Sequence, residues 1–110
     1  MDITFENERL QGVLESEKKL CREYGKFADR VKQRLDDLAA FETLDALQRE
    51  MPHIRCHELI GDRKGLLAVN ISGNFRLLFK PEEPVPLKPD GGLDWKQVRN
   101  IVIIGIADYH

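Results

Sequence analysis

The sequence predicts a single α+β domain, residues 1–110, with an N-terminal helical hairpin packed on one face of a mostly antiparallel, twisted β-sheet. Three observations support this prediction. Apolar residues recur at helical spacing between residues 8 and 51, strand-like segments dominate after Pro52, and one short alternating segment precedes the helices. A chain of 110 residues is long enough for one hydrophobic core and too short for two.

The first elements are a short strand and two helices. "DITFE" (2–6) alternates polar and apolar residues, as a strand does. From Glu8 on, apolar residues follow at steps of three and four, and Gly25 stands where a helix is capped, so the pattern predicts one helix from Glu8 to Gly25. A second helix is predicted over residues 27–39, paired with the first as an antiparallel hairpin.

A short third helix and a β-hairpin come next. Thr43 is a suitable N-cap, and Pro52 ends the helix because its ring and missing N–H cannot continue the hydrogen-bond ladder. "LLAVNI" (66–71) and "FRLLF" (75–79) are typical of strands, and the Ser72-Gly73-Asn74 turn between them predicts antiparallel pairing.

The last part of the chain is a loop and a strand. "PEEPVPLKPDGG" (81–92) holds four of the five prolines, and therefore predicts a long loop. An apolar run over residues 98–107 predicts the third long strand.

Charge, hydropathy and cysteine content bear on the partners and the cellular compartment that can be expected for the protein. The formal net charge is only −2, which does not by itself indicate a nucleic-acid or membrane partner, although residues 49–80 carry six basic and three acidic groups. No apolar run approaches the roughly 20 residues of a membrane helix. Cys21 and Cys56 are expected to be buried free thiols, and the absence of a secretion signal predicts a cytoplasmic protein.

Four features carry candidate chemistry: His57, the "GDRKG" turn (61–65), Arg76, and the terminal Asp108-Tyr109-His110. Each also has a structural explanation. Strand alternation directs Arg76 away from the face of its apolar neighbours, and exposure of that second face to solvent would explain the arginine. His57 could be an ordinary surface residue and the "GDRKG" turn an ordinary solvated turn. The last three residues could be a frayed terminus. Histidines and cysteines do not follow a recurring zinc pattern, so no metal or other cofactor is predicted.

Taken together, "CHELIGDRKGLLAVNISGNFRLLF" and the final "DYH" resemble the HigB group of the RelE/ParE toxin superfamily, also called plasmid maintenance killer proteins. The shared pattern is a histidine, a leucine two residues later, G-D-R-x-G, a strand, a tight turn, an aromatic-Arg pair, a strand, and a last strand ending in Asp-Tyr-His. It covers residues 57–79 and 105–110 closely.

The resemblance implies a RelE/ParE-like fold and the toxin of a bacterial type II toxin–antitoxin pair, acting as a ribosome-dependent mRNA endonuclease (an mRNA interferase). It implies catalytic roles for His57, Asp108, Tyr109 and His110, and a phosphate contact for Arg76. The turn cations Arg63 and Lys64 are further candidates for binding the RNA backbone. Cleavage without a metal needs a base for the 2′-OH, a cation for the phosphorane and an acid for the leaving oxygen. Which histidine is base and which is acid stays open.

The implied partners are the ribosome, mRNA and a helix-turn-helix antitoxin similar to HigA, with a heterotetramer as one assembly. The sequence also departs from the family pattern: Ile60 stands where a lysine is often found, Leu67 replaces an aromatic residue, and the chain is not basic. An alternative is therefore a degenerate or ParE-like member that binds a protein such as DNA gyrase without cleaving RNA. A domain that binds only its antitoxin is a third reading.

Overall fold

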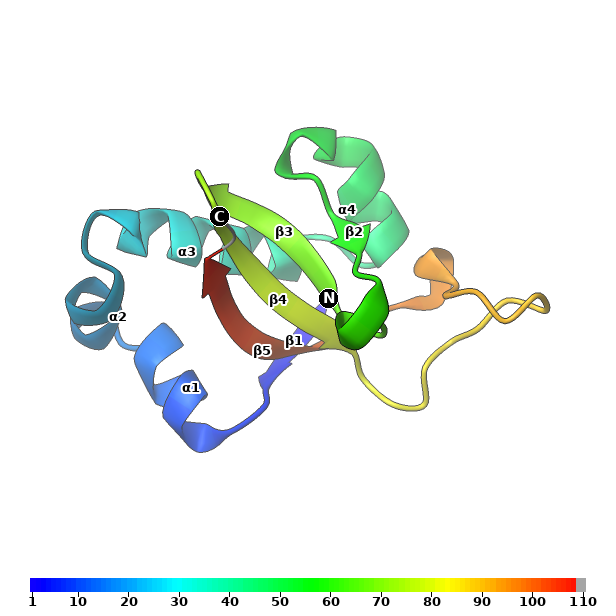
Figure 1. Cartoon of the computed structure of the whole chain (residues 1–110), viewed down its shortest axis with the longest axis horizontal. Coiled ribbons are helices and arrows are strands. Elements are labelled where there is room, and N and C mark those ends of the chain that lie inside the picture. Colours follow the sequence, from blue (N-terminus) through cyan, green and yellow to red (C-terminus); the bar gives the residue numbers. More distant parts are fainter. Residues whose placement is uncertain (109–110) are drawn as a thin grey trace.

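The computed structural model describes residues 1–108 and has an α+β architecture, as predicted (Figure 1). In this range the helices are α1 (Glu8–Leu14), α2 (Glu17–Tyr24), α3 (Ala28–Ala40) and α4 (Leu44–Glu50). The strands are β1 (Asp2–Phe5), β2 (His57–Glu58), β3 (Leu67–Ser72), β4 (Phe75–Pro81) and β5 (Asn100–Asp108). Single 3₁₀ turns are η1 (Gly25–Phe27), η2 (Pro52–Ile54), η3 (Gly61–Arg63) and η4 (Trp95–Gln97).

The described strands form one mixed sheet in the order β1-β5-β4-β3-β2. The β1 strand runs parallel to β5, and every other pair is antiparallel. The register shifts between Leu78 and Phe79, where β5 carries an extra residue and Gly105 takes a φ of +155° opposite Leu78. The bulge increases the local twist of the central strands. The predicted β3–β4 hairpin is confirmed, and its turn consists of Gly73 and Asn74.

The core lies between the sheet and the helices of the N-terminal region. Helix α3 contacts β1 and β3 and runs behind the sheet in Figure 1. The largest fully buried side chains come from the helices, the turn η2 and three strands: Val31, Leu38, Leu44, Leu47, Ile54, Leu67, Val69, Ile71, Leu77, Phe79, Ile101 and Ile103. Each large apolar side chain removed from water contributes roughly 1.5–3 kcal/mol, which makes this layer the main source of stability.

The predicted single helix from Glu8 to Gly25 is wrong: the segment forms two helices that pack against each other. Ser16 interrupts it, because its backbone is extended (φ −102°, ψ 114°) and its side chain accepts a hydrogen bond from the Lys19 N–H at 3.2 Å. Because an N-cap residue has a non-helical backbone, Ser16 cannot continue α1 while it caps α2. Gly25 caps α2 with a φ of +53°, as expected.

Other boundaries shift by a few residues. The third predicted helix is α4, capped by Thr43, and the last predicted strand, 98–107, is β5 at Asn100–Asp108. Sequence patterns did not predict the two-residue strand β2. Both cysteines are free, but only Cys56 is buried; Cys21 is exposed, contrary to expectation.

The proline-rich segment is a loop except for Pro81, which ends β4. It extends away from the sheet in Figure 1, and Leu87 and Leu93 form an isolated bridge across it. The loop returns through η4, where Trp95 Nε1 donates a hydrogen bond to Glu58 Oε2 at 3.0 Å. No helix in residues 1–108 is long and apolar enough to cross a membrane.

Candidate anion-binding site

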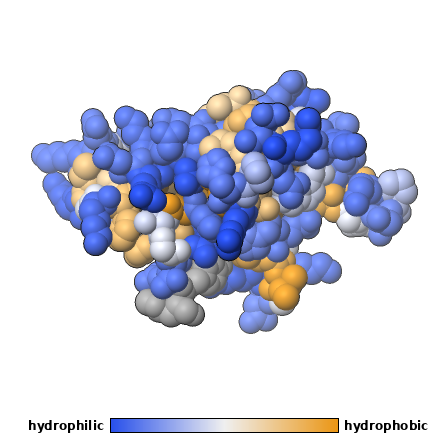
Figure 2. All heavy atoms as spheres, turned by 90° about the horizontal axis from the view of Figure 1, so that it is seen from above, coloured by the Kyte–Doolittle hydropathy of each residue, from blue (hydrophilic) through white to orange (hydrophobic). Residues whose placement is uncertain are grey.

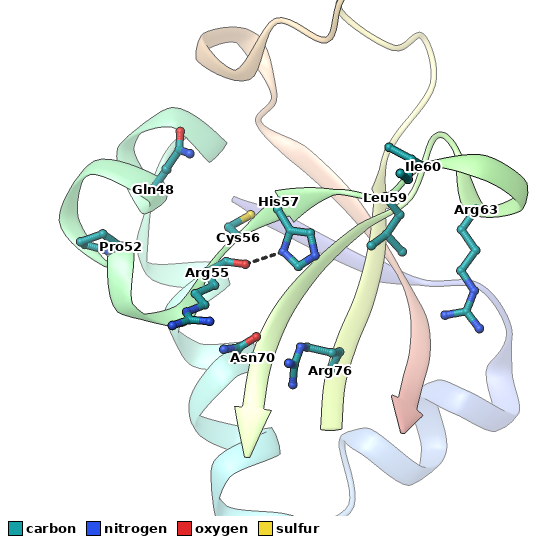
Figure 3. Close-up of a pocket in the computed structure, with 10 residues that line it drawn as sticks. All are labelled: Gln48, Pro52, Arg55, Cys56, His57, Leu59, Ile60, Arg63, Asn70 and Arg76. Atoms are coloured by element: carbon teal, nitrogen blue, oxygen red, sulfur yellow. Dashed lines mark hydrogen bonds between the residues drawn. The ribbon is translucent and has the colours of Figure 1, made fainter. Parts of the chain in front are cut away.

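A cavity of about 750 Å³ lies on the sheet face that Arg76 shares with Asn70, opposite the core (Figure 3). Arg76 reaches this face because it alternates with Leu77, which is fully buried in the core. The cavity is bordered by β2, β3 and β4 and by the segments around η2 and η3. Its lining residues are Gln48, Pro52, Arg55, Cys56, His57, Leu59, Ile60, Arg63, Asn70 and Arg76.

The charge of this lining is positive. Arg55, Arg63 and Arg76 bring guanidinium groups from three separate segments, as Figure 3 shows, and none of the ten lining residues is acidic. A guanidinium remains charged in proteins and matches phosphate geometry with two parallel donors. The cavity therefore suits an anion with several oxygen acceptors.

His57 stands at the cavity on the short strand β2, opposite Ala68 of β3. Its Nδ1 lies 2.7 Å from the main-chain carbonyl oxygen of Arg55. A carbonyl oxygen only accepts hydrogen bonds, so Nδ1 carries the proton in this contact. In the neutral ring Nε2 then has a free lone pair, which enables His57 to take a proton from a substrate.

Arg76 is held by the hairpin turn next to it. Its Nη1 donates to the carbonyl oxygens of Gly73 at 2.8 Å and Phe75 at 3.1 Å. Within residues 1–108, Nε and Nη2 have no hydrogen-bond partner. The guanidinium is thus anchored by one nitrogen and retains donors for an anion.

The two cations of the "GDRKG" turn separate in the structure. Gly61, with a φ of +68°, begins η3, and Arg63 lines the same cavity as His57 and Arg76. Lys64 instead borders a second cavity of about 620 Å³, between the start of β3 and the proline-rich loop. Of the predicted phosphate-binding residues, the structure brings Arg63 and Arg76 together and leaves Lys64 apart.

Of the three C-terminal residues predicted to be catalytic, the structure describes only Asp108. Asp108 is exposed at the end of β5 and pairs with Phe75, whereas Ala107 lies directly opposite Arg76. Asp108 is not among the residues that line the cavity. Tyr109 and His110 lie outside the described residues.

Sequence reasoning missed Arg55, Gln48 and Asn70. The only signal for Arg55 was the excess of basic residues in the middle of the chain, and nothing marked the two amides. Cys56 also lines the cavity, but burial, and to a lesser extent the charge of Glu58, raises the pKa of its thiol to about 12. The thiol stays protonated at neutral pH and is unsuited to act as a nucleophile.

Among the described residues, no group of three or more His, Cys, Asp or Glu side chains is placed to hold a metal ion. No protein-family model matches the sequence. A search of curated proteins likewise finds no match.

Proposed function

We propose that this chain is the toxin of a bacterial type II toxin–antitoxin pair, of the HigB group in the RelE/ParE superfamily, and that it cleaves mRNA on the ribosome. The motif that joins His57, the "GDRKG" turn and Arg76 supports the family. The helices packed on a mostly antiparallel sheet agree with a RelE/ParE-like fold. Ribosomes and mRNA are cytoplasmic, and so is the expected site of action.

One observation carries the proposal: a histidine whose Nδ1 lies against a main-chain carbonyl oxygen lines a cavity together with three arginines, and none of the described lining residues is acidic. This combination matches the needs of RNA cleavage without a metal. The arginines bind the scissile phosphate and compensate the charge that grows on it as it becomes five-coordinate. The histidine is within the same cavity, where it meets the adjacent ribose.

The proposed reaction is an internal phosphoryl transfer. His57 Nε2 takes the proton of the ribose 2′-OH, and the 2′-oxygen forms a bond to phosphorus. The bond from phosphorus to the 5′-oxygen breaks, which leaves a 2′,3′-cyclic phosphate on one fragment. The departing 5′-oxygen takes a proton from an acid, for which His110 and Tyr109 are the candidates; Asp108 orients that end of the chain.

The test is to map mRNA 5′ ends in bacteria after the protein is induced, using a matched pair of histidine variants. His53 lies in η2, exposed and outside the cavity lining, so His53→Gln is the control for His57→Gln. We expect cleavage within translated frames by the unaltered protein and by His53→Gln. Loss of a general base lowers the rate by roughly 10²–10⁴-fold, so His57→Gln is expected to give almost no new ends.

A charge-matched pair tests the phosphate contact. Arg76→Gln is expected to abolish cleavage, whereas Arg99→Gln, which removes an arginine paired with Glu42 outside the cavity, is expected to retain it. Undiminished cleavage by both His57→Gln and Arg76→Gln would exclude the proposed site. Co-expression with a helix-turn-helix protein from the neighbouring reading frame is expected to suppress the toxicity.

The alternative is a gyrase-binding protein with the same fold. The exposed Ile60 at the rim of the cavity favours it, because an apolar side chain 88% exposed suits a protein surface better than RNA. Growth arrest with intact mRNA and altered DNA supercoiling would select this alternative.

A further inference from the structure

Arg55 has an unusual backbone conformation. In residues 1–108 it is the only residue other than glycine with a positive φ, at φ 53° and ψ 54°. This left-handed region is unfavourable for a residue with a Cβ atom, and such residues concentrate where function requires a particular geometry. The strain calls for a structural cause.

The neighbours of Arg55 impose this conformation. Ile54 and Cys56 on either side are both buried in the core, with 1% and 7% of their surfaces exposed. The Arg55 N–H donates to the Pro52 carbonyl oxygen at 3.1 Å and closes the η2 turn. The chain therefore reverses within one residue between two anchored side chains.

This conformation places the carbonyl group and the side chain of Arg55 at the same site. Its carbonyl oxygen lies 2.7 Å from His57 Nδ1, the contact marked in Figure 3. Its side chain lines the same cavity as Arg63 and Arg76. Within the described part of the chain, its guanidinium makes no hydrogen bond and no ion pair, and so its donors remain available for a ligand.

We infer that Arg55 is a positioning residue for His57 and, through its guanidinium, a third cation that binds the phosphate of the RNA substrate. The inference rests on the proposed function and adds to it a residue outside the family pattern. The carbonyl fixes His57 in the tautomer that leaves Nε2 free to accept a proton. The guanidinium supplies a positive charge to a cavity whose lining residue Ile60 contributes none.

Two substitutions separate the backbone role from the side-chain role. Arg55→Gly removes the guanidinium but readily keeps a positive φ, so the carbonyl stays in place. Arg55→Val removes the guanidinium and strongly disfavours a positive φ, because its side chain is branched at Cβ. Arg49→Gln, at an exposed arginine of α4 outside the cavity, is the charge control.

The experiment measures two properties of the isolated full-length protein. Long-range ¹H–¹⁵N spectra report the tautomer of the neutral His57 ring, and titration with inorganic phosphate and with adenosine 3′-monophosphate reports anion affinity. We expect the Nδ1–H tautomer in the unaltered protein and in Arg55→Gly. Both Arg55 variants are expected to bind the anions about tenfold more weakly, as the loss of one charged hydrogen bond predicts, and Arg49→Gln equally well. Arg55→Val is expected to shift the tautomer toward Nε2–H.

Each part of the inference has an outcome that rejects it. A predominant Nε2–H tautomer in the unaltered protein rejects the positioning role, even if Arg55→Val does not fold. Full anion affinity in Arg55→Gly rejects the third cation. Because neither measurement uses mRNA or ribosomes, the expected tautomer and affinities without mRNA cleavage would reject the proposed function and retain the anion site. Conversely, mRNA cleavage together with an Nε2–H tautomer and full anion affinity of Arg55→Gly would retain the proposed function and reject the inference about Arg55.

Discussion

Trp95 and Glu58 are 37 residues apart in the sequence, and a hydrogen bond of 3.0 Å from Nε1 to Oε2 joins them. Glu58 directly follows His57 in β2, and Trp95 begins the turn at the end of the proline-rich loop. The bond therefore links the loop to the strand that carries the candidate base. It provides a structural role for η4, which also packs against α4.

We predict that Trp95→Phe lowers the free energy of unfolding by at least about 1 kcal/mol, because one solvent-accessible hydrogen bond is lost and a smaller aromatic ring replaces the indole. Urea unfolding measures the loss. A double-mutant cycle with Glu58→Ala isolates the pair, with an expected coupling of roughly 0.5–1 kcal/mol. A coupling near zero would show that the bond does not stabilise the protein.

Alkaline pH is expected to destabilise the protein through Cys56. Burial raises the pKa of its thiol from 9.0 to about 12, so between these values the unfolded chain loses a proton that the folded protein keeps. Stability therefore falls as pH rises above about 9, by up to ~1.4 kcal/mol per pH unit. Urea unfolding of Cys56→Ala between pH 8 and 10.5 tests this, since the variant is expected to lose less stability over that range. Equal slopes for the two proteins would contradict the assignment.

The break between α1 and α2 predicts a cost for Ser16→Ala. The substitution removes the acceptor of the Lys19 N–H, and loss of an N-cap costs about 1 kcal/mol. Thr43→Ala at the start of α4 is the matched case, with a bond of 3.1 Å to the Ala46 N–H. Thermal unfolding compares them, and a stabilised Ser16→Ala would indicate that one continuous helix is preferred.

Ile60→Lys is expected to increase anion affinity. Ile60 is 88% exposed and lines the cavity, so a lysine there adds a charge near the three arginines without disturbing the core. An exposed ionic contact contributes roughly 0.2–1 kcal/mol, which corresponds to a gain in phosphate affinity between about 1.4-fold and about fivefold. Ile60→Gln provides the control of similar polarity without charge. Calorimetry that shows no difference between these two variants would place residue 60 too far from the anion.

The order of helices and strands was predictable because each has a distinct periodicity and clear boundary residues. Gly25, Thr43, Pro52 and Gly73 all mark element ends, as expected. The Ser16 break was missed because apolar spacing continues across it, and the spacing alone does not show whether a serine faces solvent or caps a new helix. The two-residue β2 is too short for any periodic signal.

The candidate site was predictable only over the residues that resemble the pattern of the HigB group. His57, Arg63 and Arg76 belong to the motif, and the structure places them around one cavity. Arg55 lies outside it, and its contribution depends on a main-chain carbonyl and a left-handed conformation. Side-chain identity does not encode either feature. Lys64 directly follows Arg63 in the sequence, but η3 ends between them, and the two residues line different cavities.

The position of β5 in the sheet affects how the protein folds during its synthesis. In the sheet it lies between β1 and β4, and Asp2 pairs with Asn100. During synthesis β1 (Asp2–Phe5) is made first and has no partner until β5 (Asn100–Asp108) is made, and β4 lacks one neighbour from its own synthesis until that of β5. Closing so long a stretch of chain is entropically slow. A protein that cleaves mRNA during translation, as proposed, would thus complete its own sheet only after the codons of β5 have been translated from its own mRNA.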